Sequence, residues 1–240
     1  METMLQLESV TVQFGSGDTA MRPLADVNIT IQAGERVALI GANGSGKSTL
    51  LRVLAGVQPG FIGQRRVQKV PCGMVFQHPY LLRMSVLRNV ALVPWLAGMR
   101  WSLARDKAMH TLETFGLVDL AERSAHSLSG GQVQRVAIAR AWAGGPQILF
   151  LDEPSANLDP RAKREAEAFM QQVTARDTAL TLVFASHNLG QVKRLATRVI
   201  FMDAGVVRAD LPVDVFFSGH RLADEFPEAQ QFVRGETRMP

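Results

Sequence analysis

The sequence predicts a three-layer α/β fold with an antiparallel β-subdomain and an inserted α-helical subdomain. Apolar and polar residues alternate through much of the segment from Met4 to Ile31, which is typical of antiparallel strands with one solvated face. Continuous apolar runs at Val37–Ile40 and Ile148–Leu151 are typical of parallel strands that are buried on both faces. Helical patterns replace strand patterns between about residues 79 and 142. Strands and helices that alternate in this way predict helices packed on a sheet.

Local signals place the elements of the α/β part. A helix is predicted over Lys47–Ala55, where Gly56 ends it, and a third buried strand over Thr181–Ala185. Asp159 as N-cap, with Pro160 at the first helical position, predicts the start of another helix. The apolar face of that helix has helical spacing and consists of Ala166, Phe169, Met170 and Val173.

The inserted subdomain is predicted to hold one helix from Ser85 toward Leu96 and another from Ser102 to Gly116. Its expected bounds are about 79–142, which leaves a core of residues 1–78 and 143–240. Asp203-Ala204-Gly205 lies between two apolar runs and predicts a late β-hairpin. No internal repeat and no low-complexity tract is visible, so we expect a single cassette. The residues after Gly219 give no strong signal.

The composition is that of a globular protein that can bury a sizeable core, since 47% of the 240 residues are hydrophobic and 20% are charged. The chain has no apolar run of about 18 residues, and Met1-Glu2-Thr3 lacks the features of a signal peptide. The lone Cys72 excludes an internal disulfide and a cysteine zinc site. A net charge of only +4, with dispersed arginines, argues against nucleic acid as a partner. We expect a cytosolic protein that reaches a membrane only through a partner.

A phosphate-binding loop is predicted at Gly41-Ala42-Asn43-Gly44-Ser45-Gly46-Lys47-Ser48-Thr49, which fits G-x-x-x-x-G-K-[ST] between a strand and a helix. Glycine at positions 41, 44 and 46 permits positive φ and brings successive N–H groups near one anion. Lys47 adds a charge for the β- and γ-phosphates, and the Ser48 hydroxyl can ligate Mg²⁺. A Gly/Ser-rich turn without a ligand is the alternative.

Two carboxylates end the buried strand at Ile148–Glu153, and adjacent strand residues point to opposite sides. Asp152 is expected to hold Mg²⁺ through water. Glu153 is expected to face the γ-phosphate as a general base or water-positioning group. The alternative is that both acids cap the helix after Pro154. The phosphate loop in the same chain favours the nucleotide site.

A second helix start stands at Leu128-Ser129-Gly130-Gly131-Gln132. Taken locally it is a capping box, with Ser129 as N-cap and Gln132 three residues on. Gly130 and Gly131 weaken the first helical turn, yet they expose N–H groups at the positive end of the helix. A second phosphate is the ligand that such an end would bind.

With these motifs the sequence resembles, over nearly its whole length, the ATP-binding cassette ATPases, the motor subunits of ABC transporters. The family's motifs occur in the family's order: Walker A (Gly41–Thr49), Q-loop (Gln77), signature (Leu128–Gln132), Walker B (Ile148–Glu153), D-loop (Ser155–Asp159) and switch histidine (His187). The resemblance implies a P-loop NTPase (RecA-like) core that binds ATP and Mg²⁺ and hydrolyses ATP. It also implies a head-to-tail C2 homodimer, in which the signature of one copy contacts the γ-phosphate held by the other.

The resemblance assigns roles residue by residue. The implied catalytic residues are Lys47, Gln77, Glu153 and His187. The implied metal ligands are Ser48, Gln77 and Asp152. The implied ATP contacts are Phe14, Gly41, Asn43, Gly44, Ser45, Gly46, Lys47, Ser48, Thr49, Ser129, Gly130, Gly131, Gln132 and Asp159.

Single residues in this set have alternative readings. His187 alone could be a surface or core histidine, but its place after a buried strand and before an N-cap at Asn188 favours the switch role. The family usually has Asp where Asn188 stands. Phe14 fits the aromatic residue that stacks on adenine, and a strand aromatic in the core is its alternative. Tyr80-Leu81-Leu82 lies where the family receives a helix of the membrane subunit, so exposed apolar surface is expected there.

The leading hypothesis is an ATPase that drives solute import through transmembrane permease subunits, at the cytoplasmic face of the bacterial inner membrane. A periplasmic or extracellular solute-binding protein would be an indirect partner. The stretches Val75–Val86, Leu189–Gln191 and Asp214–Phe217 look most like the ATPases of tungstate and related oxyanion importers. Alternatives are phosphate or amino-acid import, a lipoprotein-type exporter, and a soluble ABC ATPase of ribosomes or DNA repair. A P-loop kinase would leave Leu128–Gln132 and His187 unexplained.

Overall fold

The computed structural model describes residues 2–15, 20–155, 158–177, 179–218, 222 and 225–235. By its internal contacts the chain forms two compact units, Met1–Lys69 with Thr181–Pro240, and Val70–Leu180. Most of the predicted turn at 15–18, residues 156–157 of the D-loop-like stretch and Gly219 lie outside the described residues. No helix in the described ranges is long and apolar enough to cross a bilayer.

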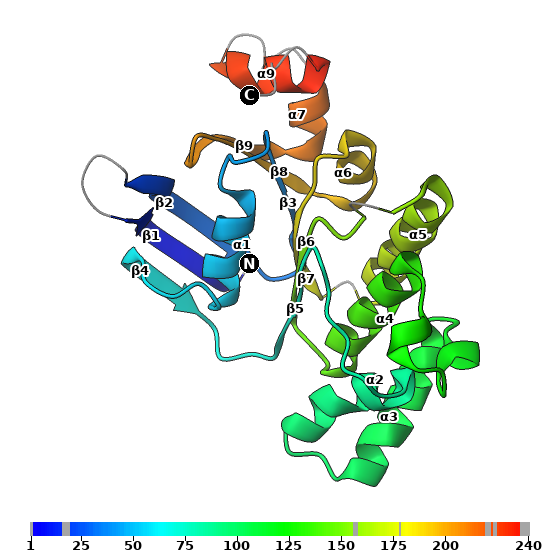
Figure 1. The fold of residues 1–240 in the computed structure, drawn as a ribbon. Coiled ribbons are helices and arrows are strands. Elements are labelled where there is room, and N and C mark those ends of the chain that lie inside the picture. Colours follow the sequence, from blue (N-terminus) through cyan, green and yellow to red (C-terminus); the bar gives the residue numbers. More distant parts are fainter. Residues whose placement is uncertain are drawn as a thin grey trace. The chain divides into compact units, whose positions relative to one another are not determined.

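The first unit contains an antiparallel sheet in the order β2-β1-β4 (Figure 1). β1 is Thr3–Phe14, β2 is Met21–Gln32 and β4 is Ile62–Val67. Buried side chains of β1 and β2 alternate with exposed or half-buried ones, which confirms the predicted strands. The sequence pattern missed β4 because none of its side chains is buried. Pairing with β1 makes it an edge strand.

Four more strands of the first unit follow one another in the order β7-β3-β8-β9. β3 (Arg36–Ile40) lies parallel between β7 (Thr181–Ala185) and β8 (Arg198–Asp203), and β9 (Val206–Pro212) pairs antiparallel with β8. All of β7 is buried, as its continuous apolar run predicts. The late hairpin is confirmed, and its turn has positive φ at Ala204 and Gly205, 46° and 80°, as two-residue turns favour.

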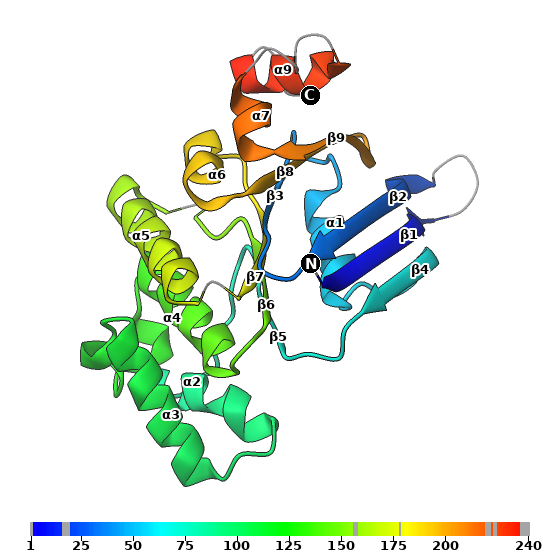
Figure 2. The same ribbon diagram turned by 180° about the vertical axis from the view of Figure 1, so that it is seen from behind.

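Helices complete the first unit. α1 is Lys47–Ala55, and Gly56 ends it in a left-handed conformation, as predicted. α6 (Leu189–Leu195), α7 (Val213–Ser218) and α9 (Pro227–Arg234) follow later in the chain (Figure 2). α9 lies after Gly219, where no sequence signal was strong. It packs through Phe232, whose ring centroid is 5.5 Å from that of Phe201 in β8.

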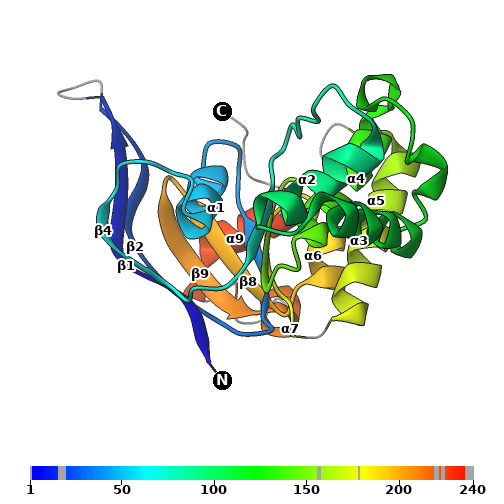
Figure 3. The ribbon, with the colours of Figure 1, turned by 90° about the horizontal axis from the view of Figure 1, so that it is seen from below.

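The second unit packs three helices against a fourth, α4 (Figure 3), and it also contains a pair of parallel strands (Figure 1). The helices are α2 (Val86–Leu96), α3 (Trp101–Thr114), α4 (Gly130–Ala143) and α5 (Pro160–Arg176), and the strands are β5 (Cys72–Val75) and β6 (Ile148–Asp152). β5 was not predicted, because it has only four residues and includes Gly73. A Cβ on Gly73 would lie 3.2 Å from the carbonyl oxygen of Ala141, so glycine lets β5 approach α4 closely.

Capping side chains account for the starts of α2, α4 and α5 in the second unit. Ser85, where the first helix was predicted to begin, caps α2. Arg100 gives α3 no side-chain cap, and α3 starts at Trp101, one residue before the expected start. The Asp159 carboxylate accepts from the backbone N–H groups of Arg161 and Ala162 at 2.9 and 3.0 Å, which confirms the predicted cap of α5. The predicted apolar face of α5 is buried at Ala166, Phe169, Met170 and Val173.

Candidate functional site

The predicted phosphate loop connects β3 to α1 in the first unit. Gly41 and Gly46 have φ of 147° and 99°, and a Cβ on either would collide with a backbone carbonyl oxygen, that of Met202 or Pro23 respectively. Both positions therefore require glycine. Gly44, with φ of 79°, has open space where its Cβ would be. The loop thus has the tight turns and the open side that a phosphate cradle needs.

Polar groups of the loop gather around the start of α1. The buried Lys47 donates from Nζ to the carbonyl oxygens of Gly41 and Ala42 at 2.9 and 2.8 Å. The Ser45 hydroxyl is buried and has no hydrogen-bond partner among the described residues. Gly46 gives α1 no side-chain cap, so its first N–H groups can bind an anion. Of the other predicted ATP contacts in this loop, one is exposed and two are half-buried: Asn43, Ser48 and Thr49.

His187 follows the carboxyl end of β7, and the phosphate loop follows the carboxyl end of β3, the neighbouring parallel strand. β7 and β3 are parallel neighbours with Ala185 opposite Leu39, and the Ser186 N–H donates to the Leu39 carbonyl at 3.0 Å. The histidine is exposed. The predicted N-cap at Asn188 is confirmed, since its Oδ1 accepts from the N–H groups of Gly190 and Gln191, at 3.0 and 3.3 Å.

A buried glutamine that the sequence analysis did not single out braces both neighbours of His187. Ser186 donates from its hydroxyl to Gln191 Oε1 at 2.7 Å, and the Asn188 N–H donates to the same hydroxyl at 3.0 Å. Gln191 is fully buried on α6. In the sequence, Gln191 shares a short predicted helix with the apolar Val192 and Leu195. A polar amide on that apolar face needs a hydrogen-bond partner, and this is the signal that could have identified Gln191.

The two acids differ in environment on the second unit. Asp152 is the last residue of β6 and is fully buried, in a strand with all five side chains buried. Glu153 was expected on the strand, but β6 ends before it and its backbone is left-handed, with φ of 45°. A non-glycine residue in that region is uncommon and costs about 1–3 kcal/mol. Such strain is typical of functional positions, and it aims Glu153 differently from a strand residue.

Gln77 lies beside Glu153. β5 and β6 are parallel with Val75 opposite Leu151, so the chain leaves both strands at one edge. Two residues later the Gln77 Nε2 donates to Glu153 Oε2 at 3.5 Å. The structure therefore brings together two of the four predicted catalytic residues on the second unit. The other two, Lys47 and His187, belong to the first unit.

The predicted second anion site begins α4. The capping box is confirmed: Gln132 N–H donates to Ser129 Oγ at 3.4 Å, and Ser129 N–H donates to Gln132 Oε1 at 3.0 Å. The two glycines differ. A Cβ on Gly131 would lie 2.7 Å from Ala162 Cβ on α5, so packing explains that glycine, whereas Gly130 is exposed beside open space. Packing therefore leaves Gly130 unexplained, and it opens the positive end of α4 to a ligand.

The remaining predicted contacts lie at the ends of elements. Phe14 ends β1 opposite Met21 and is 49% exposed, which is not the core position of its alternative reading. Asp159 is exposed, and hydrogen bonds from the backbone of Ala162 and then of Arg161 lower the pKa of its carboxyl. Tyr80 is 70% exposed, as expected for the region after Gln77, while Leu81 next to it is buried.

Comparison with known proteins places this geometry in a family. Residues 24–156 match the family described as ABC transporter. The chain is 38% identical over 211 residues to the glutamine transport ATP-binding protein GlnQ of Geobacillus stearothermophilus, covering 81% of this chain and 86% of that protein. It is 38% identical over 233 residues to the phosphonates import ATP-binding protein PhnC 1 of Haloquadratum walsbyi, covering 88% and 75%.

The mixed α/β fold matches as well. The dimeric structure of a post-hydrolysis state of the ATP-binding cassette MJ0796, bound to ADP and Pi, superposes with a TM-score of 0.78 at 28% identity, covering 88% of this chain and 99% of that one. Both comparisons agree with the three features described above: the phosphate loop before α1, the acidic residues at the end of β6, and the helix α4 that Ser129 caps. The chain therefore belongs to the ABC transporter family and is one of its ATPases.

Proposed function

We propose that this chain is the energy-coupling subunit of a solute importer, and that two copies work as a homodimer against transmembrane permease subunits. The observation that supports the homodimer is the presence of two separate helix starts on one chain that are suited to an anion, α1 behind the phosphate loop and α4 behind Ser129. One nucleotide needs only one such loop. The second is explained when it faces the nucleotide of a partner copy, and the dimeric MJ0796 cassette supports this arrangement.

Each unit supplies part of the proposed hydrolytic chemistry. On the first unit, Lys47 neutralises phosphate charge and His187 responds to the γ-phosphate. On the second unit, Glu153 accepts the proton of the attacking water, and Gln77 orients both that water and the carboxylate. ATP binding and closure of the dimer would precede hydrolysis, which reopens it.

Mg²⁺ is the proposed metal cofactor, and the donor chemistry fits it. Ser48 offers a hydroxyl oxygen on the first turn of α1, and Asp152 offers a fully buried carboxylate. The side-chain oxygen of Gln77 is the third proposed ligand. These are hard oxygen donors of the kind that Mg²⁺ prefers. The bound ion would neutralise charge on the phosphate oxygens.

Import of tungstate or a related oxyanion is the proposed direction and cargo. It rests on the resemblance of the stretches named in the sequence analysis. PhnC 1 is named for phosphonates, which are oxyanions, and supports this class. GlnQ is named for glutamine and makes amino acids the second candidate. The proposed location is the cytoplasmic face of the bacterial inner membrane, with a solute-binding protein on the other side.

The homodimer is tested by sedimentation velocity with the Glu153→Gln variant, whose slow hydrolysis should trap bound ATP. We expect monomers without nucleotide and dimers with Mg²⁺-ATP. Adding Ser129→Glu puts a negative charge at the second anion site, and should abolish the dimer while each monomer still binds ATP. Dimers that persist in the Ser129→Glu variant, or ATP-loaded chains that stay monomeric, would contradict the proposal.

Direction and cargo are tested by first examining the genes that flank this one for a permease and a solute-binding protein, and then reconstituting those proteins with this chain in proteoliposomes. ATP hydrolysis should rise when the binding protein carries tungstate. For import, labelled tungstate should accumulate on the side of the bilayer to which this chain is bound. Stimulation by phosphate or glutamine instead would reassign the cargo. Co-purification of the chain with ribosomes rather than membranes would favour the soluble alternative, and stimulation by a lipoprotein would favour the exporter.

A further inference from the structure

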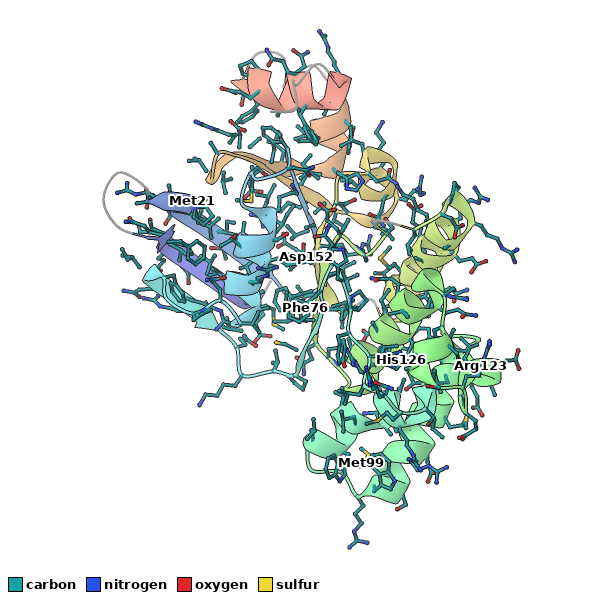
Figure 4. All side chains as sticks on the ribbon, in the orientation of Figure 1. Met21, Phe76, Met99, Arg123, His126 and Asp152 are labelled. Atoms are coloured by element: carbon teal, nitrogen blue, oxygen red, sulfur yellow. The ribbon has the colours of Figure 1, made fainter. Side chains whose placement is uncertain are left out.

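An exposed apolar cluster lies where α2 turns into α3 on the second unit. It consists of Trp95 and Leu96 at the end of α2 with Trp101 and Leu103 at the start of α3, and we call these four residues the tryptophan tip. Their exposed fractions are 46%, 70%, 39% and 54% in that order. Figure 4 labels Met99, which lies on the connection between the two helices. None of these residues takes part in the chemistry assigned above.

Ring packing and backbone hydrogen bonds hold the tryptophan tip in a defined turn. The indole rings of Trp95 and Trp101 meet edge to face, with centroids 5.9 Å apart. Gly98 turns the chain with φ of 95°, and the N–H groups of Gly98 and Met99 donate to the carbonyls of Trp95 and Pro94 at 2.9 and 3.1 Å. Large apolar side chains presented to water in this way are unfavourable without a partner, so a contiguous exposed patch marks an interaction surface.

The charge around the tip is mostly positive. No Asp or Glu occurs from Val70 to Arg105, and the first acidic residue is the exposed Asp106 that follows on α3, whereas four exposed arginines do occur: Arg83, Arg88, Arg100 and Arg105. Within the described part of the chain, none of the four guanidinium groups has an ion-pair or hydrogen-bond partner. The net charge of the whole chain is only +4, so this concentration is local. Such a surface is complementary to an anionic one.

Helical spacing places one arginine on the same helix face as each tryptophan, further from the α2–α3 connection. Arg105 follows Trp101 by four residues on α3, and Arg88 precedes Trp95 by seven on α2, so each pair shares a helix face. Along the helix axes these separations are about 6 and 10 Å. A membrane surface is layered over similar distances, with amphipathic indoles at the interface and phosphates outside it.

We propose that the tryptophan tip binds the surface of an anionic bilayer, with the indoles at the interface and Arg88, Arg100 and Arg105 at the lipid phosphates. A bilayer is favoured because the indoles lie at one level of the tip and Arg88 and Arg105 lie further along the same helix faces; an acidic protein partner is the alternative that the experiment tests. The contact goes beyond the proposed motor function, because it needs neither ATP nor a permease, and it departs from the expectation that the chain reaches a membrane only through a partner.

Tryptophan fluorescence can isolate the tip. The chain has three tryptophans, and Trp142→Phe leaves only Trp95 and Trp101 while keeping an aromatic ring against Phe115. In this background the full chain is mixed with vesicles of phosphatidylglycerol and phosphatidylcholine, or of phosphatidylcholine alone, at low salt. We expect a blue shift and co-flotation with the anionic vesicles only, and release at high salt.

Matched variants assign the binding to the tip. Arg100→Gln with Arg105→Gln should weaken the vesicle partition coefficient roughly 25-fold, about fivefold per arginine. Trp95→Ala with Trp101→Ala should weaken co-flotation at least about tenfold. Val118→Ala, which trims an exposed apolar residue outside the tip, should change nothing. Circular dichroism checks folding, and if the tryptophan variant does not fold, the arginine variant and Leu96→Ser decide.

The proposal is overturned if the chain does not bind anionic vesicles, binds both vesicle types equally, or binds as before after the arginine and tip substitutions. Binding that appears only when permease is added would overturn it too, and would assign the tip to a protein partner. Any of these results leaves the motor function standing, since ATP-driven dimerisation is measured without vesicles.

Discussion

In the second unit the amide of Gln77 donates to the carboxylate of Glu153 over 3.5 Å. The two residues meet because β5 and β6 are parallel neighbours and each residue lies just beyond the end of its strand. Glu153 also leaves its strand with a left-handed backbone. The long hydrogen bond and the left-handed backbone both contribute to the orientation of the carboxylate in the absence of substrate.

This pair predicts a non-additive loss of ATP hydrolysis. Glu153→Gln should lower kcat by about 10²–10⁴, the range for removal of a general base. Gln77→Ala alone should lower kcat about tenfold, the low end for the loss of one hydrogen bond to a charged group, because this bond is long. In the Glu153→Gln background the second change should add little. Steady-state phosphate release measures all four proteins, and two losses that multiply would show that the residues act independently.

The backbone of Glu153 predicts a difference between two substitutions that both remove the carboxylate. Alanine at position 153 keeps the left-handed strain, whereas glycine relieves it, so Glu153→Gly should be more stable than Glu153→Ala by about 1 kcal/mol. Urea unfolding measures the difference.

The matched control for this strain is exposed Gln172 inside α5. Gln172→Gly should be less stable than Gln172→Ala, the opposite order, because glycine is unfavourable within a helix. An alanine variant at position 153 that equals or exceeds the glycine variant in stability would contradict the strain.

Local signals explain what the sequence could predict. Lys47–Ala55 has a glycine stop, Ser129 and Asp159 have the hydroxyl or carboxylate of an N-cap, and the buried strands have continuous apolar runs. Each of these depends on a few neighbouring residues, and each is present in the structure. The site residues could be named because their motifs are also local.

Features that depend on pairing across the chain were missed. β4 has no buried side chain, and β5 is short and contains glycine, so neither has a pattern without its partner strand. The approach of Gln77 to Glu153 depends on the register of β5 against β6, which no local signal contains. The role of Gln191 likewise appears only when its amide is found buried against Ser186.

Gly131 predicts a packing defect that a second substitution should repair. Gly131→Ala puts a Cβ 2.7 Å from Ala162 Cβ, so α4 and α5 must separate, and we expect a loss of about 1–3 kcal/mol. Ala162→Gly alone should cost about 1 kcal/mol, as glycine does in a helix. Because the clash needs both methyl groups, the double variant should be more stable than the sum of the two losses predicts.

Gly130→Ala is the matched control for this cycle. Open space surrounds its Cβ position, so stability should change by less than about 0.5 kcal/mol. Urea midpoints of the four proteins and this control decide the matter. Equal changes in stability for Gly130→Ala and Gly131→Ala would mean that the contact with Ala162 does not explain the glycine at 131.

Gln191 is predicted to act on hydrolysis by positioning His187. Gln191→Met keeps the volume of the side chain but removes the acceptor of the Ser186 hydroxyl, which should cost about 1–2 kcal/mol of stability. Since that hydroxyl also holds the Asn188 N–H, both neighbours of His187 lose their brace. We expect a lower kcat with an unchanged KM for ATP, because the phosphate loop is not altered.

The decisive comparison is made in a His187→Ala background. If Gln191 acts through the histidine, Gln191→Met should lower kcat in the native chain and have no further effect once His187 is gone. A purely structural role would lower activity by the same factor in both backgrounds. Gln231→Met, on the exposed surface of α9, controls for the methionine itself and should leave kcat unchanged. A change in KM instead of kcat would move the role of Gln191 from positioning the histidine to binding nucleotide.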